Sequence, residues 1–305
     1  MVLNRSLNTY TVLKDGRVLI AGGIGVVGTT PDALTHCEIY DPVKNTFSKT
    51  GDLTSKRAGH GAALLADGRV LVVGGINAIP PTELTKLLSF LATGLKSSAE
   101  IYDPAKGTWS KTSSIRNKSF APTLVTLKDG KTLVCGGVVL TSIFGIPTGL
   151  VSTKTCERFD PKSDKWSSAA SMKVARTMHG PCTVLMPDGR VLSCGGVSVN
   201  FTLTKQSIDT LADAEAYDPV KNTWVAQPKL AANSTGHVAT VVPDGRVFVT
   251  GVGAGRIVQA FDPKQNTWTR LKDMQQPRSG HAALVTPDGV LTLFGPTTSM
   301  EIIHP

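Results

Sequence analysis

Arginine recurs at one position of a repeated motif, and its side chain could bind anions. A planar guanidinium group matches the paired oxygens of carboxylates and sulfates and keeps its charge throughout the physiological pH range. If the repeats are arranged symmetrically, these side chains gather near one opening and form a ligand-binding set. The alternative is structural: each arginine belongs to the repeat pattern and bridges neighbouring units. The set comprises Arg5, Arg57, Arg116, Arg176 and Arg278, and Ser234 interrupts it.

A second series lies three residues after the first and is rich in histidine. Converging imidazole groups are good ligands for transition metals, so a metal site is one interpretation. No cysteine and histidine cluster has the spacing of a zinc site, however. The residues of this series are Asn8, His60, Ser119, His179, His237 and His281.

Cysteine content and net charge narrow the classes of partner. The five cysteines cannot all form internal disulfides, and we expect them to be small buried apolar residues. They are Cys37, Cys135, Cys156, Cys182 and Cys194. The net charge of +9 favours anionic partners through long-range attraction. Nucleic acid is not expected, because the chain has no run of five basic residues and no helix-turn-helix pattern.

The elements that must position these residues also recur, at a period of about fifty residues. Each unit holds Asp-Gly between two apolar runs, which predicts a hairpin of strands a and b. Gly-Gly then ends strand b, and the dipeptide Tyr-Asp or its equivalent followed by Pro ends strand c. One large aromatic residue starts strand d and should pack between adjacent sheets. These aromatic residues are Phe47, Trp109, Trp166, Trp224 and Trp268.

The order of these signatures resembles the kelch motif, in a form similar to bacterial kelch-repeat proteins. The resemblance implies an all-β fold, a six-bladed β-propeller of four-stranded antiparallel blades forming a single domain over residues 1–305. The blades span approximately residues 1–53, 54–114, 115–172, 173–230, 231–274 and 275–305. The last blade should lack its outer strand, because the sequence ends at the Glu301 motif and too few residues precede Arg5 to supply a strand. A truncated chain is the alternative explanation for the missing strand.

The resemblance also implies roles for the recurrent residues. Histidine is part of the common Arg-x-x-His pattern, in which it hydrogen-bonds the backbone, so no metal and no cofactor is expected. The repeated glutamates of strand c are expected to be structural; they are Glu38, Glu100, Glu157, Glu215 and Glu301. Ligands of propellers usually bind at a channel mouth, where the b–c loops emerge together with the connections from strand d to the next strand a.

The b–c loops carry the residues that do not repeat. Repeat 2 inserts residues 77–98, in which leucines share one helical face between Thr82 and Gly94. Repeat 3 inserts residues 138–155. Repeat 4 inserts residues 197–213, with Ile208 and Leu211 at helical spacing. These inserts should pack on one another as a cap, or else form an apolar docking surface above the arginines.

Three classes of function remain. One is a plain structural module with no small-molecule site, in which the apolar inserts would plug the mouth. The favoured one is a kelch-repeat binding module that recognises a protein or anionic ligand at the b–c loop face through the arginine set. The alternative is an isomerase resembling a sialic-acid mutarotase, acting on an acidic sugar at the same mouth; its catalytic residues are unknown. We expect a soluble protein, because no signal peptide or membrane-spanning segment is evident. Its compartment would be the cytoplasm for the sequence as given, or the exterior if the sequence is a mature fragment. We also expect a monomer.

Overall fold

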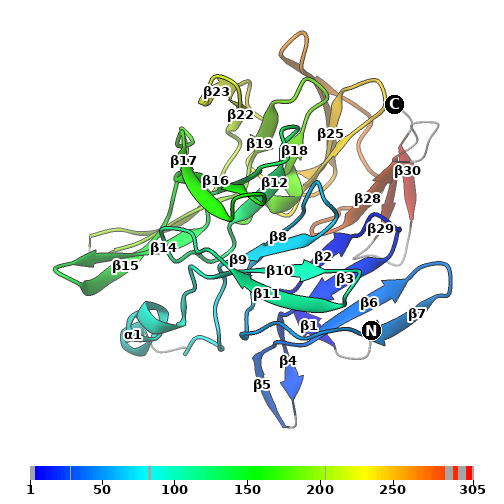
Figure 1. The fold of residues 1–305 in the computed structure, drawn as a ribbon. Helices are drawn as coiled ribbons and strands as arrows, with labels where there is room; N and C mark the ends of the chain where they lie inside the picture. The colour runs from blue at the N-terminus through cyan, green and yellow to red at the C-terminus, as the bar shows by residue number, and fades with distance from the viewer. Residues whose placement is uncertain are drawn as a thin grey trace. The chain divides into compact units, whose positions relative to one another are not determined.

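The computed structural model describes residues 4–27, 29–81, 84–202, 204–285, 291–294 and 300–303. The chain divides into two compact units, one of residues 1–169 with 200–206 and one of residues 170–199 with 207–305. Each unit is built from antiparallel sheets that follow the repeats (Figure 1). We call the sheet of one repeat a blade.

The first unit holds three four-stranded blades, each with its strands in chain order from a to d apart from inserted elements. Blade 1 consists of β2 (Thr9–Val12), β3 (Val18–Ala21), β6 (Cys37–Asp41) and β7 (Thr46–Lys49). Blade 2 consists of β8 (Gly61–Leu64), β9 (Val70–Val73), β10 (Ala99–Asp103) and β11 (Thr108–Thr112). Blade 3 consists of β12 (Thr123–Thr126), β13 (Thr132–Cys135), β16 (Cys156–Asp160) and β17 (Lys165–Ala169).

The second unit holds two four-stranded blades and one of three strands. Blade 4 consists of β18 (Thr183–Leu185), β19 (Val191–Cys194), β22 (Ala214–Asp218) and β23 (Thr223–Gln227), with a 3₁₀ turn at Gly180–Cys182. Blade 5 consists of β24 (Val238–Val241), β25 (Val247–Val252), β26 (Ile257–Asp262) and β27 (Thr267–Arg270). Blade 6 consists of β28 (Ala282–Val285), β29 (Leu291–Phe294) and β30 (Glu301–Ile303), the three described strands that the sequence predicted.

The Asp-Gly pairs form the a–b turns. In blade 2 the Asp67 carboxylate accepts the N–H of Arg69 at 3.0 Å, and Gly68 has φ of 95°. Such a positive φ suits glycine, which explains its place in the turn. The pair Asp288-Gly289 and the residue Gly295 of the last repeat lie outside the described residues.

The repeated aromatic residue joins one blade to the preceding one, as expected. The Trp109 ring lies 5.1 Å from the Tyr102 ring of its own blade. Its indole N–H donates to the Gly51 carbonyl of the blade before, at 3.0 Å. The same bond recurs from Trp166 to Ser113 in the first unit and from Trp268 to Pro228 in the second. One aromatic side chain per repeat therefore contributes both apolar area and a directional bond to the contact between successive blades.

The b–c loops contain most of the remaining structure. Repeat 1 inserts β4 (Ile24–Val27) and β5 (Thr30–Ala33), with which β1 (Arg5–Ser6) pairs. Repeat 2 inserts the helix α1 (Leu84–Gly94), as predicted; its proposed cap Thr82 lies outside the described residues. Repeat 3 inserts a hairpin of β14 (Val138–Ile143) and β15 (Ile146–Ser152).

The expected helical insert of repeat 4 is wrong. That segment forms β20 (Val197–Phe201) and β21 (Gln206–Thr210), and Ile208 lies within β21. Leu150 of β15 pairs with Phe201, so edge pairing with the hairpin favours extended backbone here. Two apolar residues three apart are weak evidence for a helix when a neighbouring strand edge is available.

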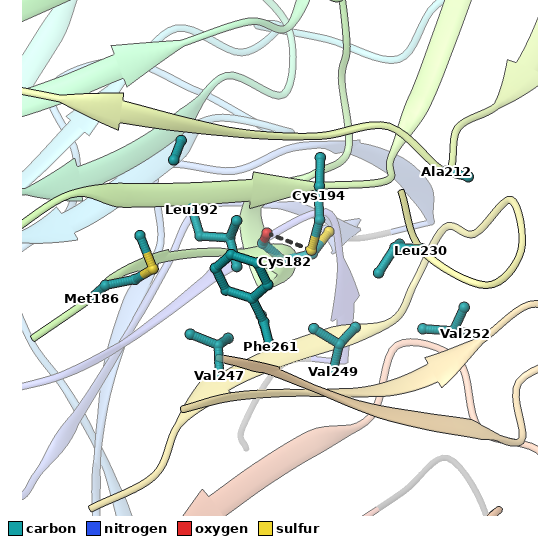
Figure 2. Close-up of a cluster of buried hydrophobic side chains, with 13 residues drawn as sticks. Cys182, Met186, Leu192, Cys194, Ala212, Leu230, Val247, Val249, Val252 and Phe261 are labelled. Atoms are coloured by element: carbon teal, nitrogen blue, oxygen red, sulfur yellow. Dashed lines mark hydrogen bonds between the residues drawn. The ribbon is translucent and has the colours of Figure 1, made fainter. Parts of the chain in front are cut away.

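The cysteines are buried apolar residues, as the sequence indicated: all five are free and buried. Figure 2 shows Cys182 and Cys194 in an apolar cluster of the second unit with Phe261, Val247 and Leu192. The Cys194 thiol donates to the Cys182 carbonyl at 3.5 Å. Burial raises the pKa of Cys194 to about 12, so its thiol stays protonated and unreactive.

No helix within the described part of the chain is long and apolar enough to cross a lipid bilayer.

Candidate functional site

Arg57, one of the predicted ligand-binding residues, lies inside its own blade. Its side chain is fully buried, with 0% exposure. The Nη1 group donates to the carbonyls of Gly74 at 2.9 Å and Ser98 at 3.0 Å, and Nη2 donates to the Glu100 carboxylate at 2.7 Å. The guanidinium group is thereby engaged by an internal carboxylate and two backbone oxygens. We call this arrangement the arginine clamp.

The arginine clamp recurs in both units. Arg5 bonds to Gly22, His36 and Glu38, and Arg176 bonds to Gly195, Asp213 and Glu215. Arg278 is 1% exposed, and its Nε lies 3.7 Å from the Glu301 carboxylate. The structural alternative considered for the arginines therefore describes these four, although each clamp closes within one repeat rather than between repeats. The gathering of arginines around a common mouth stays a prediction.

The third repeat departs from the sequence alignment. Ser119, which the sequence placed in the histidine series, occupies the arginine position. Its Oγ donates to the Gly136 carbonyl at 3.3 Å, seventeen residues on, as Arg57 Nη1 does to Gly74. Its own carbonyl accepts the Gly75 N–H at 2.8 Å, as the Arg57 carbonyl accepts the Gly23 N–H. Serine therefore interrupts the arginine series at Ser119 as well as at Ser234.

A buried apolar residue four positions earlier was the signal that could have fixed this alignment. That residue packs in the core of each repeat, and counting from it places Ser119 and not Arg116 in the series. The buried residues are Leu53, Ile115, Met172, Leu230 and Met274.

Arg116 is the one member of the predicted set whose side chain is exposed. It stands where Thr54 stands in the second repeat, and its backbone N–H donates to the Glu157 carboxylate at 3.0 Å. The equivalent N–H of Thr54 donates to Glu100 at 2.6 Å. The Arg116 guanidinium is thus directed away from the clamp position of its repeat, and it remains a candidate for contact with an external anion.

The histidines are buried near the start of the blades. His60 Nε2 lies 2.9 Å from the Thr9 hydroxyl, and His281 Nε2 lies 2.7 Å from the Thr250 hydroxyl. His237 Nε2 lies 3.2 Å from the Cys194 carbonyl. His179 is buried as well. Within the described residues, no group of three histidine, cysteine or acidic side chains is placed to hold a metal ion.

The inserts of the first unit pack on one another. Phe90 of α1, Phe120, Leu140 of β14 and Leu150 of β15 gather around a buried group that includes Ile76. Figure 1 shows α1 beside the hairpin of β14 and β15. The segment that leads into blade 3 joins them, because the Lys118 ammonium donates to the Ala92 carbonyl at 2.7 Å. Residues 84–98, 114–120 and 138–155 together form what we call the insert surface.

The hairpin tip of the insert surface exposes large apolar side chains. Phe144 is 101% exposed, and Ile143 and Ile146 are 57% and 68% exposed. Phe144 and Gly145 form the two-residue turn, with φ of 50° and 80°. Asparagine is favoured at the first position of such a turn, and a bulky residue there is unusual. The exposed ring and the two exposed isoleucines beside it form an apolar patch at this tip.

The insert surface is also strongly basic. Its three segments contain five basic residues and no aspartate or glutamate, namely Lys86, Lys96, Arg116, Lys118 and Lys154. Four of these side chains are exposed, and Lys96 is half-buried. The surface therefore combines positive charge at its base with apolar residues at its tip.

A hollow lies at the a–b turns of blades 1 and 2, with a volume of about 330 Å³. Arg17 and Arg69 line it, and each pairs with the aspartate two residues before it, at 2.7 Å. The positive charge of these arginines is therefore already balanced locally, which disfavours capture of an acidic molecule there.

A family model of the Kelch motif matches residues 120–173, which span the third blade. Curated kelch proteins match much more of the chain. Kelch-like protein 38 of Rattus norvegicus is 24% identical over 208 residues, which cover 68% of this chain and 30% of that protein. The chain contains a kelch motif and is similar to kelch-repeat proteins over about two thirds of its length.

Other comparisons extend this relationship. An F-box/kelch-repeat protein of Arabidopsis thaliana is 36% identical over 99 residues, which cover 32% of this chain and 24% of that protein. The solved structure of YjhT matches with a TM-score of 0.66 at 15% identity, covering 88% of this chain and 84% of that one. The all-β, kelch-type β-propeller class predicted from the sequence is thereby confirmed.

The chain spans less than a third of the length of the curated relatives it matches.

Proposed function

We propose that this protein is a binding module for an acidic protein segment, which docks on the insert surface of the b–c loops. The observation that carries the proposal is the exposed Phe144 at the tip of a surface with five basic and no acidic residues. An aromatic side chain fixed in solvent can fill an apolar pocket of a partner, and such residues dominate binding energies.

The basic residues supply the second part of recognition. Complementary charge steers a partner toward its site and selects against basic competitors. Arg116 contributes a guanidinium fork that can hold a carboxylate with two bonds. The hairpin from Val138 to Ile143 extends about 20 Å at the rise of a β-strand. A partner must therefore bridge an apolar tip and a charged base, which favours a peptide or protein over a small anion.

The arginine clamps argue against the alternative function, an isomerase that acts on an acidic sugar beside the predicted arginines. An acid or base for isomerisation must be open to substrate beside the arginine that holds it. The carboxylates paired with Arg57 and Arg176 are Glu100 and Glu215, each 1% exposed. These pairs serve folding, so we propose no reaction at them.

Selection of binding peptides from a displayed random library, with the wild-type protein as the target, tests the proposal. Selected sequences should be enriched in aspartate and glutamate around one aromatic or large aliphatic residue. Their affinity should fall as salt is raised, because exposed charges are screened. Selection of sequences with no acidic preference would contradict the proposal.

A double variant of the insert surface, Phe144→Asn with Arg116→Gln, should bind the selected peptides at least about tenfold more weakly. Asparagine suits the turn better than phenylalanine, so this loss cannot be attributed to an unfolded hairpin. The matched control is Val43→Asn with Lys44→Gln in the c–d turn of blade 1, where Val43 is 93% exposed. The control should bind like the wild type, as measured by fluorescence anisotropy; equal affinity of both variants would contradict the assignment.

A further inference from the structure

The third repeat keeps the carboxylate of the arginine clamp but not the arginine. Ser119 stands at the arginine position, and Glu157 stands where Glu100 stands in the second repeat. In the fifth repeat the loss of the arginine is accompanied by the loss of the carboxylate. Its Ser234 is accompanied by Gln259, a neutral residue that accepts the Ala231 N–H at 3.0 Å. Only in the third repeat does serine face a charged partner, among the repeats whose clamp residues are described.

The acceptors that surround a guanidinium group elsewhere are all present in the third repeat. In the second repeat they are the Gly74 carbonyl, the Ser98 carbonyl and the Glu100 carboxylate. Their equivalents are the carbonyls of Gly136 and Thr155 and the Glu157 carboxylate. The Gly136 N–H donates to Thr155 at 3.1 Å, as the Gly74 N–H donates to Ser98 at 3.2 Å, which fixes the correspondence.

A cavity occupies the space between these acceptors. Its volume is about 20 Å³, and Ser119, Gly136, Thr155 and Glu157 line it. Asn117, whose side chain is exposed, also lines the cavity and connects it with the protein surface. A cavity of this volume admits about one water-sized polar group, such as one amino group of a guanidinium. The corresponding space of the other clamps is filled by the arginine side chain.

The burial and the pKa of Glu157 differ from those of Glu100, which has a guanidinium partner. Its side chain is half-buried, whereas Glu100 and Glu215 are 1% exposed. Burial raises the pKa of Glu157, although the Arg116 N–H acts in the opposite direction. For Glu100, burial also acts to raise the pKa, but the Arg57 guanidinium and the Thr54 N–H lower it overall. A cation in the third repeat would supply to Glu157 what Arg57 supplies to Glu100.

We propose that this cavity binds a guanidinium group from outside the blade, either that of a small guanidinium compound or that of an arginine side chain of a partner. The group donates to the Glu157 carboxylate and to the carbonyls of Gly136 and Thr155. The nearby Arg116 and Lys96 oppose long-range attraction of a cation. Affinity therefore comes from short directional bonds, and a planar fork of donors is favoured over a compact ammonium group. Ser119 and Thr155 belong to the segments of the insert surface, but the bonds proposed here involve neither Phe144 nor the basic side chains of that surface, so either proposal can fail alone.

Two variants copied from other repeats of the same chain test the site. Glu157→Gln reproduces the serine and glutamine pair of the fifth repeat, and Ser119→Arg reproduces the clamp of the second. Both should fold, and Ser119→Arg should raise the thermal midpoint because its own guanidinium occupies the cavity. Unchanged or lowered stability of Ser119→Arg would contradict the assignment of the cavity.

Calorimetric titration of the wild type and both variants measures binding directly. The probes are methylguanidinium and N-acetyl-arginine-methylamide, with methylammonium and N-acetyl-citrulline-methylamide as matched controls. Saturable binding of a guanidinium probe to the wild type should weaken at least about tenfold in each variant, in line with loss of charge-assisted bonds. Binding of methylguanidinium alone indicates a small ligand, and binding of the arginine derivative alone indicates a partner side chain. Equal binding by Glu157→Gln, or no binding by the wild type up to about 20 mM, overturns the proposal.

Discussion

Replacing Arg57 with alanine is expected to lower the free energy of unfolding by about 3–5 kcal/mol. The change leaves the Glu100 carboxylate buried without its guanidinium partner, and it also removes the donors to the Gly74 and Ser98 carbonyls. Arg116→Ala should change the free energy of unfolding by less than about 0.5 kcal/mol, because its side chain is exposed. Urea unfolding of the two variants at pH 7 measures the contrast.

A compensated variant separates the cost of an unpaired charge from that of lost packing. Arg57→Ser combined with Glu100→Gln copies the pair of Ser234 and Gln259 in the fifth repeat. Because neither residue is then charged, the double variant should recover a large part of the stability that Arg57→Ala loses. If Arg57→Ala and Arg116→Ala proved equally stable, the arginine clamp would have no structural role.

Acid should destabilise the fold well above the pH at which most carboxylates are protonated. Burial lowers the pKa of His60 and His179 to about 3, and that of His237 and His281 to about 4. In the unfolded chain these groups have a pKa of about 6.5. Between these values the unfolded state binds more protons than the folded state, so stability is present above about pH 6.5 and is lost as the pH falls.

The size of this loss of stability follows from the difference in histidine pKa between the folded and unfolded states. At pH 5 each buried histidine can cost up to about 2 kcal/mol, since one pKa unit corresponds to about 1.4 kcal/mol. The urea midpoint should fall clearly between pH 7 and pH 5, and His60→Gln should flatten this dependence whatever it does to stability at pH 7. A midpoint that stayed constant over this range would mean that the histidines can be protonated within the fold.

The recurrent elements could be read from the sequence because each carries a local physical requirement. Gly68 supplies the positive φ of a turn, and Trp109 supplies one large ring with one donor at the same place in its repeat. Those constraints act on individual residues, so they survive in nearly every repeat. The number of strands in each described blade followed from them.

The position of the third arginine could not be read in the same way. Arg116 and Arg57 share a residue type near the start of a blade, and type alone suggested the same role. Burial separates the two residues, because Ile115 and Leu53 pack in equivalent places. The helical prediction for the insert of repeat 4 was wrong for a related reason: Phe201 of that insert pairs with Leu150 of another repeat, and spacing within one segment does not contain that information.

The candidate site depends on contacts that join distant parts of the chain. The exposed tip at Phe144 and the basic residues Lys86 and Lys96 come from different inserts, which pack together through the apolar residues Phe90, Leu140 and Leu150. The sequence indicated an apolar and basic face at the b–c loops but did not show which side chains are exposed. Nor did it distinguish arginines that hold a blade together from one that faces solvent.

Hydrogen–deuterium exchange of the wild-type protein, with and without the tightest peptide obtained by display, tests the binding assignment most directly. We predict that the peptide slows exchange in α1, in residues 114–120 and in the hairpin of β14 and β15, and that Phe144→Asn with Arg116→Gln abolishes this protection. Protection confined to the a–b or c–d turns, with the insert surface unchanged, would contradict the account.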